Sequence, residues 1–351
     1  MPTRVHSELV FTVKDRCRVC YTCVRECPVK AIKIINGQAE VVASRCIGCG
    51  NCTRVCSQNA KVFLDTTEDA VNILQSDYVK VACLAPSFPA EFSEISDYRI
   101  LAGMLKKLGF NYVMEVAFGA DLVAHEYEKN MLDENGAHEI SSDCPAVVYY
   151  VKYYYPDLVS SLTPVVSPMV ATSRVARDIY GSDCKTIFIG PCIAKKAESA
   201  ELDVVLTFVE LRKIFKQYGI TPENSGPSDF DGPPGNRAAI FPVTRGKFLS
   251  VKKTDDICEE NIFVASGKVN FREAIKEFRQ DPLATRHLEL LCCEGCIMGP
   301  GMTSEENHFS KTANIRNYVK NKLETIDQAE WEKNFNYYKN FDFSRTFSAD
   351  D

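Results

Sequence analysis

Two closely spaced runs of cysteines near the start of the chain constrain its fold more than any other feature. The first run has the spacing C-x2-C-x2-C-x3-C followed by a proline, and the second repeats the spacing without the proline. In proteins with such runs, three thiolates of one run bind a 4Fe–4S cluster and the fourth binds the cluster of the other run. The predicted ligands are therefore Cys17, Cys20, Cys23 and Cys56 for one cluster, and Cys27, Cys46, Cys49 and Cys52 for the other.

The paired runs predict a bacterial-type ferredoxin domain of the α+β class over residues 1–66, which relays electrons through its two clusters. Between the runs, residues 32–42 read as two short strands around an Asn-Gly turn. Ser57 stands where a second proline is usual, and this change leaves the ligands intact. Zinc is the alternative metal, but paired runs with a crossed fourth ligand are rare for zinc. Residues 65–76 are expected to link this domain to the next.

Composition and charge limit the classes of function. The chain has 351 residues and sixteen cysteines, which in a reducing compartment indicate metal ligands or catalysts rather than disulfides. The net charge of −6 argues against nucleic acid as a partner, because phosphate binding needs a basic surface. No apolar run reaches the roughly 18–20 residues that span a bilayer, and the first residues lack the apolar core of a signal peptide. We therefore expect a cytoplasmic protein with no nucleic-acid or membrane partner.

Alternating strand-like and helix-like segments predict a second domain over residues 77–330. This alternation is typical of an α/β domain with mainly parallel sheets, here in two lobes. Residues 111–118, NYVMEVAF, read as one of its strands. The Pro/Gly-rich stretch 226–245 is expected to be a long surface excursion. Residues 331–351 are expected to form a C-terminal tail that stops before further domains.

Further cysteines follow directly on three predicted strands of the second domain, in SSDCP, IGPC and LCCEGC. In open α/β sheets, ligands bind outside the carboxyl ends of the strands. Three strand ends that meet at one point would supply the four thiolates of a third cluster, for instance Cys144, Cys192, Cys292 and Cys296. The other cysteines are expected to be small hydrophobic packing residues or non-ligands, namely Cys83, Cys184, Cys258 and Cys293.

At these residues the chain resembles the FeFe hydrogenases, over nearly its whole length. The family signature T-S-C-C-P corresponds to SSDCP at 141–145, and M-P-C-x-x-K-x-x-E corresponds to GPCIAKKAE at 190–198. A third signature, C-x-x-G-C followed by glycines, corresponds to CCEGCIMGPG at 292–301. LAPS at 84–87 and Ser167-Pro168 match segments that line the same site in the family.

The resemblance implies an H-cluster, in which a third 4Fe–4S cubane shares one thiolate with a di-iron unit carrying carbonyl, cyanide and an azadithiolate bridge. It makes Cys296 the shared thiolate. Lys195 would bind one cyanide while Glu198 holds the lysine ammonium, and Ser87 with nearby backbone N–H groups would bind the other cyanide. The implied catalytic residues are Asp143, Lys195, Ser87, Glu198 and Ser167, and the implied cofactor-binding residues are Ala85, Pro86, Ser87, Pro191, Lys195 and Met169.

Five positions depart from the catalytic members of this family. Asp143 stands where those members have a cysteine that passes protons, and it reads equally as a turn residue or as an acid beside the cofactor. Gly190 replaces a methionine, Met169 replaces a glutamine, and Tyr127 lies near the position of a proton-relay glutamate. Pro300 interrupts the glycine run and removes one N–H donor. These departures make the chain similar to the sensory branch of the family, whose members often continue into a further cluster-binding segment and a PAS domain.

The leading hypothesis is an FeFe hydrogenase of sensory type that catalyses H2 ⇌ 2H⁺ + 2e⁻ slowly and reversibly. Its partners would be H2 and protons, together with a redox partner or a signalling protein. The alternative is a non-catalytic, hydrogenase-like iron–sulfur protein that keeps the cubane without the di-iron unit, as a cluster carrier or a signalling interaction module. A homodimer is an assembly that the sequence permits.

Overall fold

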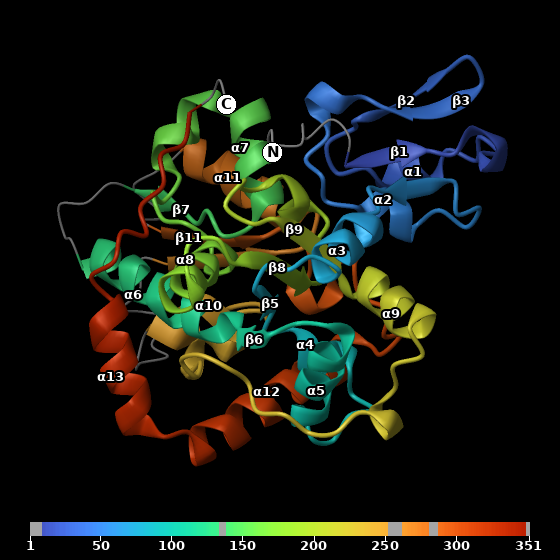
Figure 1. Ribbon diagram of the computed structural model, residues 1–351. Helices are drawn as coiled ribbons and strands as arrows, with labels where there is room; N and C mark the ends of the chain where they lie inside the picture. The colour runs from blue at the N-terminus through green and yellow to red at the C-terminus, as the bar shows by residue number, and fades with distance from the viewer. Residues whose placement is uncertain (1–8, 133–137, 252–261, 281–286, 349–351) are drawn as a thin grey trace.

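The computed structural model describes residues 9–132, 138–251, 262–280 and 287–348, which form a small lobe and a larger one (Figure 1). The small lobe contains the N-terminal part of the chain and lies at the upper right of the figure. The larger lobe contains two sheets whose strands all run parallel. The predicted order of a ferredoxin-like region followed by an α/β domain is confirmed.

The small lobe is built from two antiparallel strand pairs and two short helices. In the predicted hairpin, Asn36 and Gly37 have φ of 48° and 72°, which fits the type I′ turn that tight hairpins prefer. The strands and helices of this lobe are β1 (Val10–Thr12) paired with β4 (Lys61–Phe63), β2 (Ile32–Ile35) paired with β3 (Gln38–Val41), α1 (Thr22–Glu26) and α2 (Asn51–Arg54), with 3₁₀ turns at η2 (Lys14–Arg16) and η3 (Ala43–Arg45).

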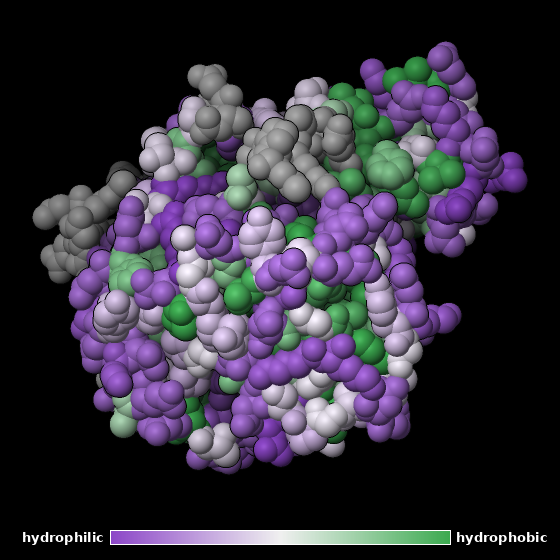
Figure 2. All heavy atoms as spheres, in the orientation of Figure 1, coloured by the Kyte–Doolittle hydropathy of each residue, from purple (hydrophilic) through white to green (hydrophobic). Residues whose placement is uncertain are grey.

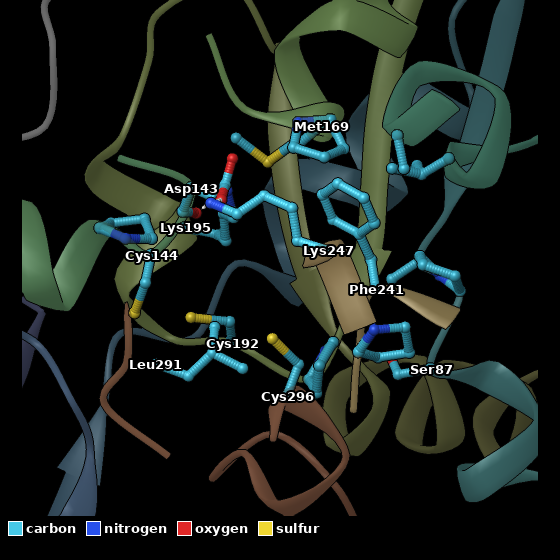
Figure 3. A pocket seen from close by; sticks show the side chains of 18 of the residues that line it. Ser87, Asp143, Cys144, Met169, Cys192, Lys195, Phe241, Lys247, Leu291 and Cys296 are labelled. Atoms are coloured by element: carbon cyan, nitrogen blue, oxygen red, sulfur yellow. Dashed lines mark hydrogen bonds and ion pairs between the residues drawn. The ribbon is translucent and has the colours of Figure 1, made fainter. Parts of the chain in front are cut away.

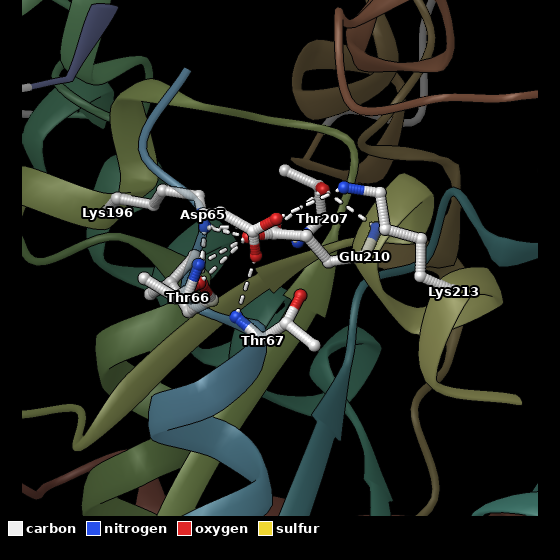
Figure 4. A network of polar contacts seen from close by, with 8 residues as sticks. Asp65, Thr66, Thr67, Lys196, Thr207, Glu210 and Lys213 are labelled. Atoms are coloured by element: carbon white, nitrogen blue, oxygen red, sulfur yellow. Dashed lines mark hydrogen bonds and ion pairs between the residues drawn. The ribbon is translucent and has the colours of Figure 1, made fainter. Parts of the chain in front are cut away.

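The predicted linker between the lobes is largely a helix, α3 (Thr67–Leu74), which packs on the larger lobe. The residue before this helix, Thr66, donates its backbone N–H to the carboxylate of Glu210 at 2.7 Å. The same carboxylate accepts from Lys196 Nζ at 2.9 Å and from the Thr207 backbone N–H at 2.7 Å (Figure 4). Glu210 is fully buried, so this network fastens the entry to the linker onto the larger lobe.

The first sheet of the larger lobe has four strands in the order β6-β5-β8-β9. Its central strand β5 has a continuous buried run from Val81 to Leu84, because helices cover both faces of a parallel sheet. The predicted strand at 111–118 is too long, since the strand stops at Glu115 and a helix begins at Val116. The strands are β5 (Lys80–Leu84), β6 (Tyr112–Glu115), β8 (Lys185–Gly190) and β9 (Val204–Thr207), and the helices are α4 (Phe88–Glu91), α5 (Arg99–Leu108), α6 (Val116–Leu132), α8 (Pro168–Tyr180) and α9 (Phe208–Gln217).

The second sheet has three strands in the order β10-β11-β7, and α7 and α11 pack beside it. Tyr150 of α7 meets Phe271 of α11 edge-on at 5.1 Å, while Tyr154 of α7 donates to the Arg45 carbonyl of the small lobe at 2.9 Å. No helix in the described ranges is both long and apolar enough to cross a bilayer. The elements are β7 (Glu139–Ile140), β10 (Ile262–Ser266), β11 (His287–Leu291), α7 (Pro145–Tyr154), α10 (Gly246–Val251), α11 (Asn270–Gln280), α12 (His308–Thr325) and α13 (Gln328–Tyr338).

The stretch 226–245 is only partly the surface excursion that its composition predicts. Its second half forms a short 3₁₀ turn, and Ala238 and Ala239 there are fully buried. The carboxylate of Asp121 on α6 accepts from the backbone N–H groups of Asn236 and Ala238 at 2.7 and 2.9 Å. A buried carboxylate therefore holds this stretch against the larger lobe.

Residues 331–348 pack as part of the larger lobe, so the expectation of a separate tail from residue 331 is wrong. The proposed boundary falls inside α13. The following residues 341–347, which we name the C-terminal strap, run beside the segment that leads into α8. The Val166 N–H donates to the Phe343 carbonyl at 2.9 Å, and the Arg345 N–H donates to the Pro164 carbonyl at 3.0 Å. Phe343 is buried, which anchors the strap in the core.

Candidate cluster and cofactor sites

The carboxyl ends of the two sheets face one cavity in the larger lobe (Figure 3). The segments that follow β5, β7, β8 and β11 all contribute to its wall, as ligand sites in parallel sheets generally require. Much of the wall is apolar, with Phe188 and Phe241 among the lining residues. Ten of the predicted site residues line it, namely Ala85, Pro86, Ser87, Asp143, Cys144, Met169, Pro191, Cys192, Lys195 and Cys296.

Three thiols point into the cavity from one side, those of Cys144, Cys192 and Cys296 (Figure 3). Burial raises the pKa of Cys192 to about 12, and the neighbouring Cys144 adds to that rise while Lys195 opposes it. The pKa of Cys296 is raised by burial and then by Cys144 and Cys192. Three thiols that perturb one another so strongly when buried would be stabilised as thiolates by a metal cluster.

The fourth predicted ligand, Cys292, lies at the edge of this group, behind the cavity wall. Its backbone N–H points at the Cys144 thiol, and its own thiol lies near the thiol of Cys49 in the small lobe, with which it lines a separate cavity. This contact lowers the pKa of Cys49 and raises that of Cys292. The neighbouring Cys293 has its pKa raised by burial and then by Cys192 and Cys144, so its thiol also lies near the group.

Lys195 is held in place from two sides. Its ammonium donates to the backbone carbonyl of Asp143 at 3.1 Å and forms an ion pair with Glu198, whose side chain is 2% exposed. Arg345 of the C-terminal strap shares this carboxylate at 3.5 Å and also donates to the Glu198 carbonyl at 3.0 Å. The predicted pair of Lys195 and Glu198 is therefore present. The contribution of Arg345 has no local signal in the sequence.

Two predicted hydroxyl groups are buried without a hydrogen-bond partner in the described part of the chain, those of Ser87 and Ser167. Ser87 lines the cavity, and Ser167 directly precedes α8, whose second residue Met169 also lines it. A buried hydroxyl without a partner is costly, so these residues indicate a place for an acceptor that the protein itself does not supply. Together with the Lys195 ammonium, they fit a ligand with anionic acceptor groups such as cyanide.

Asp143 forms a buried ion pair with Lys247 of α10, and no motif in the sequence singles out this lysine. Lys247 Nζ lies 2.6 Å from Asp143 Oδ2, and the two side chains are 4% and 15% exposed. The ammonium also sits 3.8 Å from the centre of the Tyr127 ring. Burial lowers the pKa of Lys247, but the charge of Asp143 and that of nearby Glu289 outweigh this and raise it.

The pair argues against one of the two readings of Asp143, and the other reading, an acid beside a cofactor, stays a prediction. Asp143 is not a turn residue that satisfies local N–H groups, because its Oδ2 is bound by an ammonium 104 positions away. Its Oδ1 is buried without a partner in the described residues. Glu289 is a further acid that sequence reasoning missed, although a glutamate inside the apolar strand HLELL is a visible signal. Burial raises the pKa of Glu289, and Lys247 opposes that rise.

Two of the positions that depart from the family signatures, Gly190 and Pro300, are explained by the atoms packed around them. A Cβ atom at Gly190 would lie 2.7 Å from the Phe188 ring and 2.9 Å from Ala85 Cβ, so Phe188 occupies the space in which a larger residue would sit. Pro300 packs against the small lobe, where a Cβ atom at Gly50 would meet its ring at 2.6 Å. The glycine run passes against backbone, because Gly301 donates to the Pro191 carbonyl at 2.8 Å.

The small lobe contains a separate cavity for the first predicted cluster. All four predicted ligands line it, namely Cys17, Cys20, Cys23 and Cys56. The fourth comes from the second run, as the crossed pattern requires. Cys20 is exposed, so this site lies at the outer edge of the lobe.

The second predicted ligand set, which contains Cys27, Cys46, Cys49 and Cys52, is more deeply buried. Burial raises the pKa of Cys46 to about 11, and Cys49 and Cys27 contribute to that rise. The pKa of Cys52 is also raised by burial, and then by Cys49 and Cys46. Because Cys49 also touches Cys292, this site adjoins the third one. The assignment of ligands to clusters stays a prediction.

The remaining cysteines do not gather into a further site. Cys83 and Cys184 are buried in the core of the larger lobe, as expected for small hydrophobic residues, and Cys258 lies outside the described residues. In the described ranges, no three His, Cys, Asp or Glu side chains come close enough together to hold a single metal ion. The predicted ligand cysteines instead line cavities, as Cys17, Cys20, Cys23 and Cys56 do in the small lobe.

Two family models match the chain. Residues 78–300 match the C-terminal domain of the iron-only hydrogenase large subunit, and residues 9–57 match a 4Fe–4S dicluster domain. An FeFe-hydrogenase variant from Chlamydomonas reinhardtii superposes with a TM-score of 0.64 at 17% identity, over 82% of this chain and 99% of that one. At this identity the superposition establishes the fold alone.

The curated relatives include hydrogenases and probable cytosolic Fe–S cluster assembly factors. The NADP-reducing hydrogenase subunit HndD of Solidesulfovibrio fructosivorans is 26% identical over 68% of this chain and 50% of its own length. Iron hydrogenase 1 of Clostridium pasteurianum is 23% identical over 82% of this chain and 64% of its own. A probable cytosolic Fe–S cluster assembly factor of Drosophila virilis is 22% identical over 59% and 52%. The chain thus spans about half to two thirds of the length of these relatives.

Proposed function

Because this chain belongs to the iron-only hydrogenase family, we propose that it interconverts H2 with protons and electrons at a cofactor held in the cavity of the larger lobe. The observation that carries the proposal is a group of polar side chains in a largely apolar cavity, where the Lys195 ammonium, the unpartnered Ser87 hydroxyl and three thiols line the same space. A core that only stabilises the fold does not need an ammonium, an unpartnered hydroxyl and three thiols around one cavity. An anionic metal cofactor would satisfy them all.

In this proposal Cys144, Cys192, Cys292 and Cys296 bind a third cubane, and Cys296 also anchors a di-iron unit with carbonyl, cyanide and azadithiolate ligands. That unit would supply a metal centre that polarises H2 and an amine that accepts a proton. The chain's own part is to bind and orient it. Lys195, fixed by Glu198, would donate to one cyanide, and Ser87 would donate to the other. Ala85, Pro86, Pro191 and Met169 line the cavity and exclude water from it. Ser167, whose hydroxyl has no partner in the described residues, would be a further donor near Met169.

Electrons would pass through the small lobe. The thiol contact between Cys49 and Cys292 links the second predicted ferredoxin site to the third site in the larger lobe. The first site has the exposed Cys20 on its rim. The order of transfer is therefore from the cavity to the inner site, then to the outer site, and from there to a redox partner or a signalling protein.

Slow turnover in the service of H2 sensing is part of the proposal. Asp143, at the position of the proton-passing cysteine, is held in an ion pair by Lys247 rather than free to exchange protons with the cavity. A group that moves protons well needs a pKa near the operating pH and freedom to release its partner. A cytoplasmic location also remains part of the proposal.

The second candidate function is a cluster carrier or interaction module that keeps the cubane without a di-iron unit. Relatives that are probable Fe–S assembly factors support this reading. The Asp143–Lys247 pair supports it too, because it removes the expected proton donor. The unpartnered Ser87 and the Lys195–Glu198 pair weigh against it.

Infrared spectroscopy separates the two functions. Protein reconstituted with iron and sulfide, then matured with the synthetic di-iron unit, should show metal-bound carbonyl and cyanide bands and slow H2-dependent reduction of a dye. Cys296→Ala, which retains Lys195, is the matched control and should lose the bands. Maturation that leaves no bands in the unmutated protein, despite a full third cubane, would establish the carrier function instead.

A further inference from the structure

A lysine is buried in the small lobe, and in the part of the chain that the structure describes it forms no ion pair with a carboxylate. Lys61 on β4 is 3% exposed, and its ammonium donates to the Ala39 carbonyl at 2.6 Å and to the Thr12 hydroxyl. None of the three acidic residues between positions 9 and 64 pairs with Lys61, because each either lies beside another lysine or is exposed. Glu26 pairs with Lys268, Glu40 lies 3.9 Å from Lys14, and Asp15 is exposed.

The internal repeat of the small lobe shows that this lysine replaces an apolar core residue. Residues 27–32, CPVKAI, correspond to residues 56–61, CSQNAK, so Lys61 occupies the place of Ile32. The geometry of the two halves agrees. The Ala31 N–H points at Cys27 Sγ at 3.3 Å, the Ala60 N–H points at Cys56 Sγ at 3.3 Å, and Ile32 is buried like Lys61.

Burying an ammonium whose hydrogen-bond acceptors are all neutral oxygens costs free energy, so we expect an anion near Lys61. Lys61 lines the cavity that the first ligand set surrounds. Burial raises the pKa of the Cys23 thiol in that cavity, and the Lys61 ammonium opposes the rise. Its charge also acts, more weakly than burial and neighbouring thiols, on Cys46 and Cys52 of the second set. The anion that the site calls for is a thiolate-bound cluster.

We propose that Lys61 sets the reduction potential of the outer cluster, raising it above that of the inner cluster beside Ile32. The inference rests on the proposed cluster assignment. Reduction adds an electron to a centre whose net charge is already negative, so a fixed buried cation stabilises the reduced form, and charge near the cluster is one of the main determinants of its potential. Electrons would then collect at the exposed end of the relay, which favours H2 oxidation over proton reduction.

The test is a potentiometric titration, followed by electron paramagnetic resonance, of full-length protein reconstituted with three cubanes and no di-iron unit. Lys61→Met removes the charge at similar volume, and Lys61→Gln also keeps a donor for the Ala39 carbonyl. At the original midpoint of the outer cluster, both variants should lower the reduced-to-oxidised ratio at least tenfold, a shift of 59 mV for one electron. The inner cluster should shift less, and the third cluster not at all.

Lys33→Met is the matched control, because it removes an exposed lysine of the same lobe. Lys61→Arg retains the charge and should retain the potential. The inference is overturned if iron content is preserved and Lys61→Met and Lys61→Gln shift the outer cluster no more than Lys33→Met does. Failure of the unmutated small lobe to hold two cubanes would instead refute the cluster assignment, and iron analysis distinguishes that result.

Discussion

The Asp143–Lys247 ion pair is buried deeply enough that removing one charge should destabilise the protein more than removing both. Each single replacement leaves the other charge in the cavity wall without its counter-ion. Breaking a buried pair in this way costs about 3–5 kcal/mol, whereas replacing both partners by neutral residues of similar volume is often close to neutral. The informative variants are Asp143→Asn, Lys247→Met and the double variant.

The two single variants should differ, because the surroundings of the two charges differ. Lys247→Met leaves Asp143 with both oxygens unpartnered, since Oδ1 already has no partner in the described residues. We expect a loss of about 3–4 kcal/mol in the free energy of unfolding. Asp143→Asn leaves the ammonium over the Tyr127 ring, a contact of about 0.5–2 kcal/mol, and close to Glu289. For Asp143→Asn we expect a loss of about 2–3 kcal/mol in the free energy of unfolding, and for the double variant a loss of at most about 1 kcal/mol.

Urea unfolding of cubane-reconstituted protein under anaerobic conditions measures these losses, with the fluorescence of Trp331 reporting on the larger lobe. Lys213→Met is the control, because the pair of Lys213 with Asp65 at 3.1 Å has side chains 55% and 53% exposed. Such a surface pair contributes about 0–1 kcal/mol. Single variants that lose less than the control does, or a double variant whose loss equals the sum of the two, would refute the reasoning.

Three further predictions concern the clusters, the cofactor and the pH dependence. Cys192→Ala should lower the iron content of cubane-reconstituted protein from about 12 to about 8 per chain; iron analysis measures this, and about 8 in the unmutated protein would contradict a third cubane. Lys195→Ala should keep its cubanes but capture the di-iron unit poorly, because a lost charge-assisted hydrogen bond costs on the order of 1.5–3 kcal/mol. Cyanide bands that stay unshifted in the infrared spectrum of this variant would show that the lysine does not bind cyanide. Burial raises the pKa of Asp121 to about 7, although the N–H groups of Ala238 and Asn236 favour its charged form. The folded protein therefore keeps a proton that the unfolded chain releases near pH 4. The free energy of unfolding should then fall as the pH rises from about 4 to 7, by up to about 1.4 kcal/mol per unit, and urea titrations at pH 5.5 and 7 should show a smaller fall for Asp121→Asn.

The parts of the site that the sequence could predict are those carried by short runs. Cysteine spacing marks the ligand sets of the small lobe, and cysteines at strand ends mark Cys144 and Cys192, because topology brings parallel strand ends to one edge. Lys195 and Glu198 are three residues apart on one turn, so their pairing is also local.

The parts that could not be predicted depend on long-range packing. Lys247 reaches Asp143 across 104 positions, and nothing in GKF marks that lysine as buried. Lys61 looks like an ordinary polar residue of a short strand until its neighbours are known. The packing of residues 331–348 could not be predicted for the same reason. The C-terminal strap, which contains Phe343, pairs with residues near 165 that lie far away in the sequence.

The C-terminal strap has a consequence for the order of events during synthesis. Arg345 contacts Glu198, which holds Lys195, and it leaves the ribosome 147 residues after Glu198 does. At 5–20 residues per second this interval is ~7–30 s. The small lobe, which is complete by residue 64, can fold and receive its clusters early in that process. The wall of the cavity in the larger lobe gains the support of Arg345 only when the strap has emerged, so the pair of Lys195 and Glu198 is fully held only from that point on.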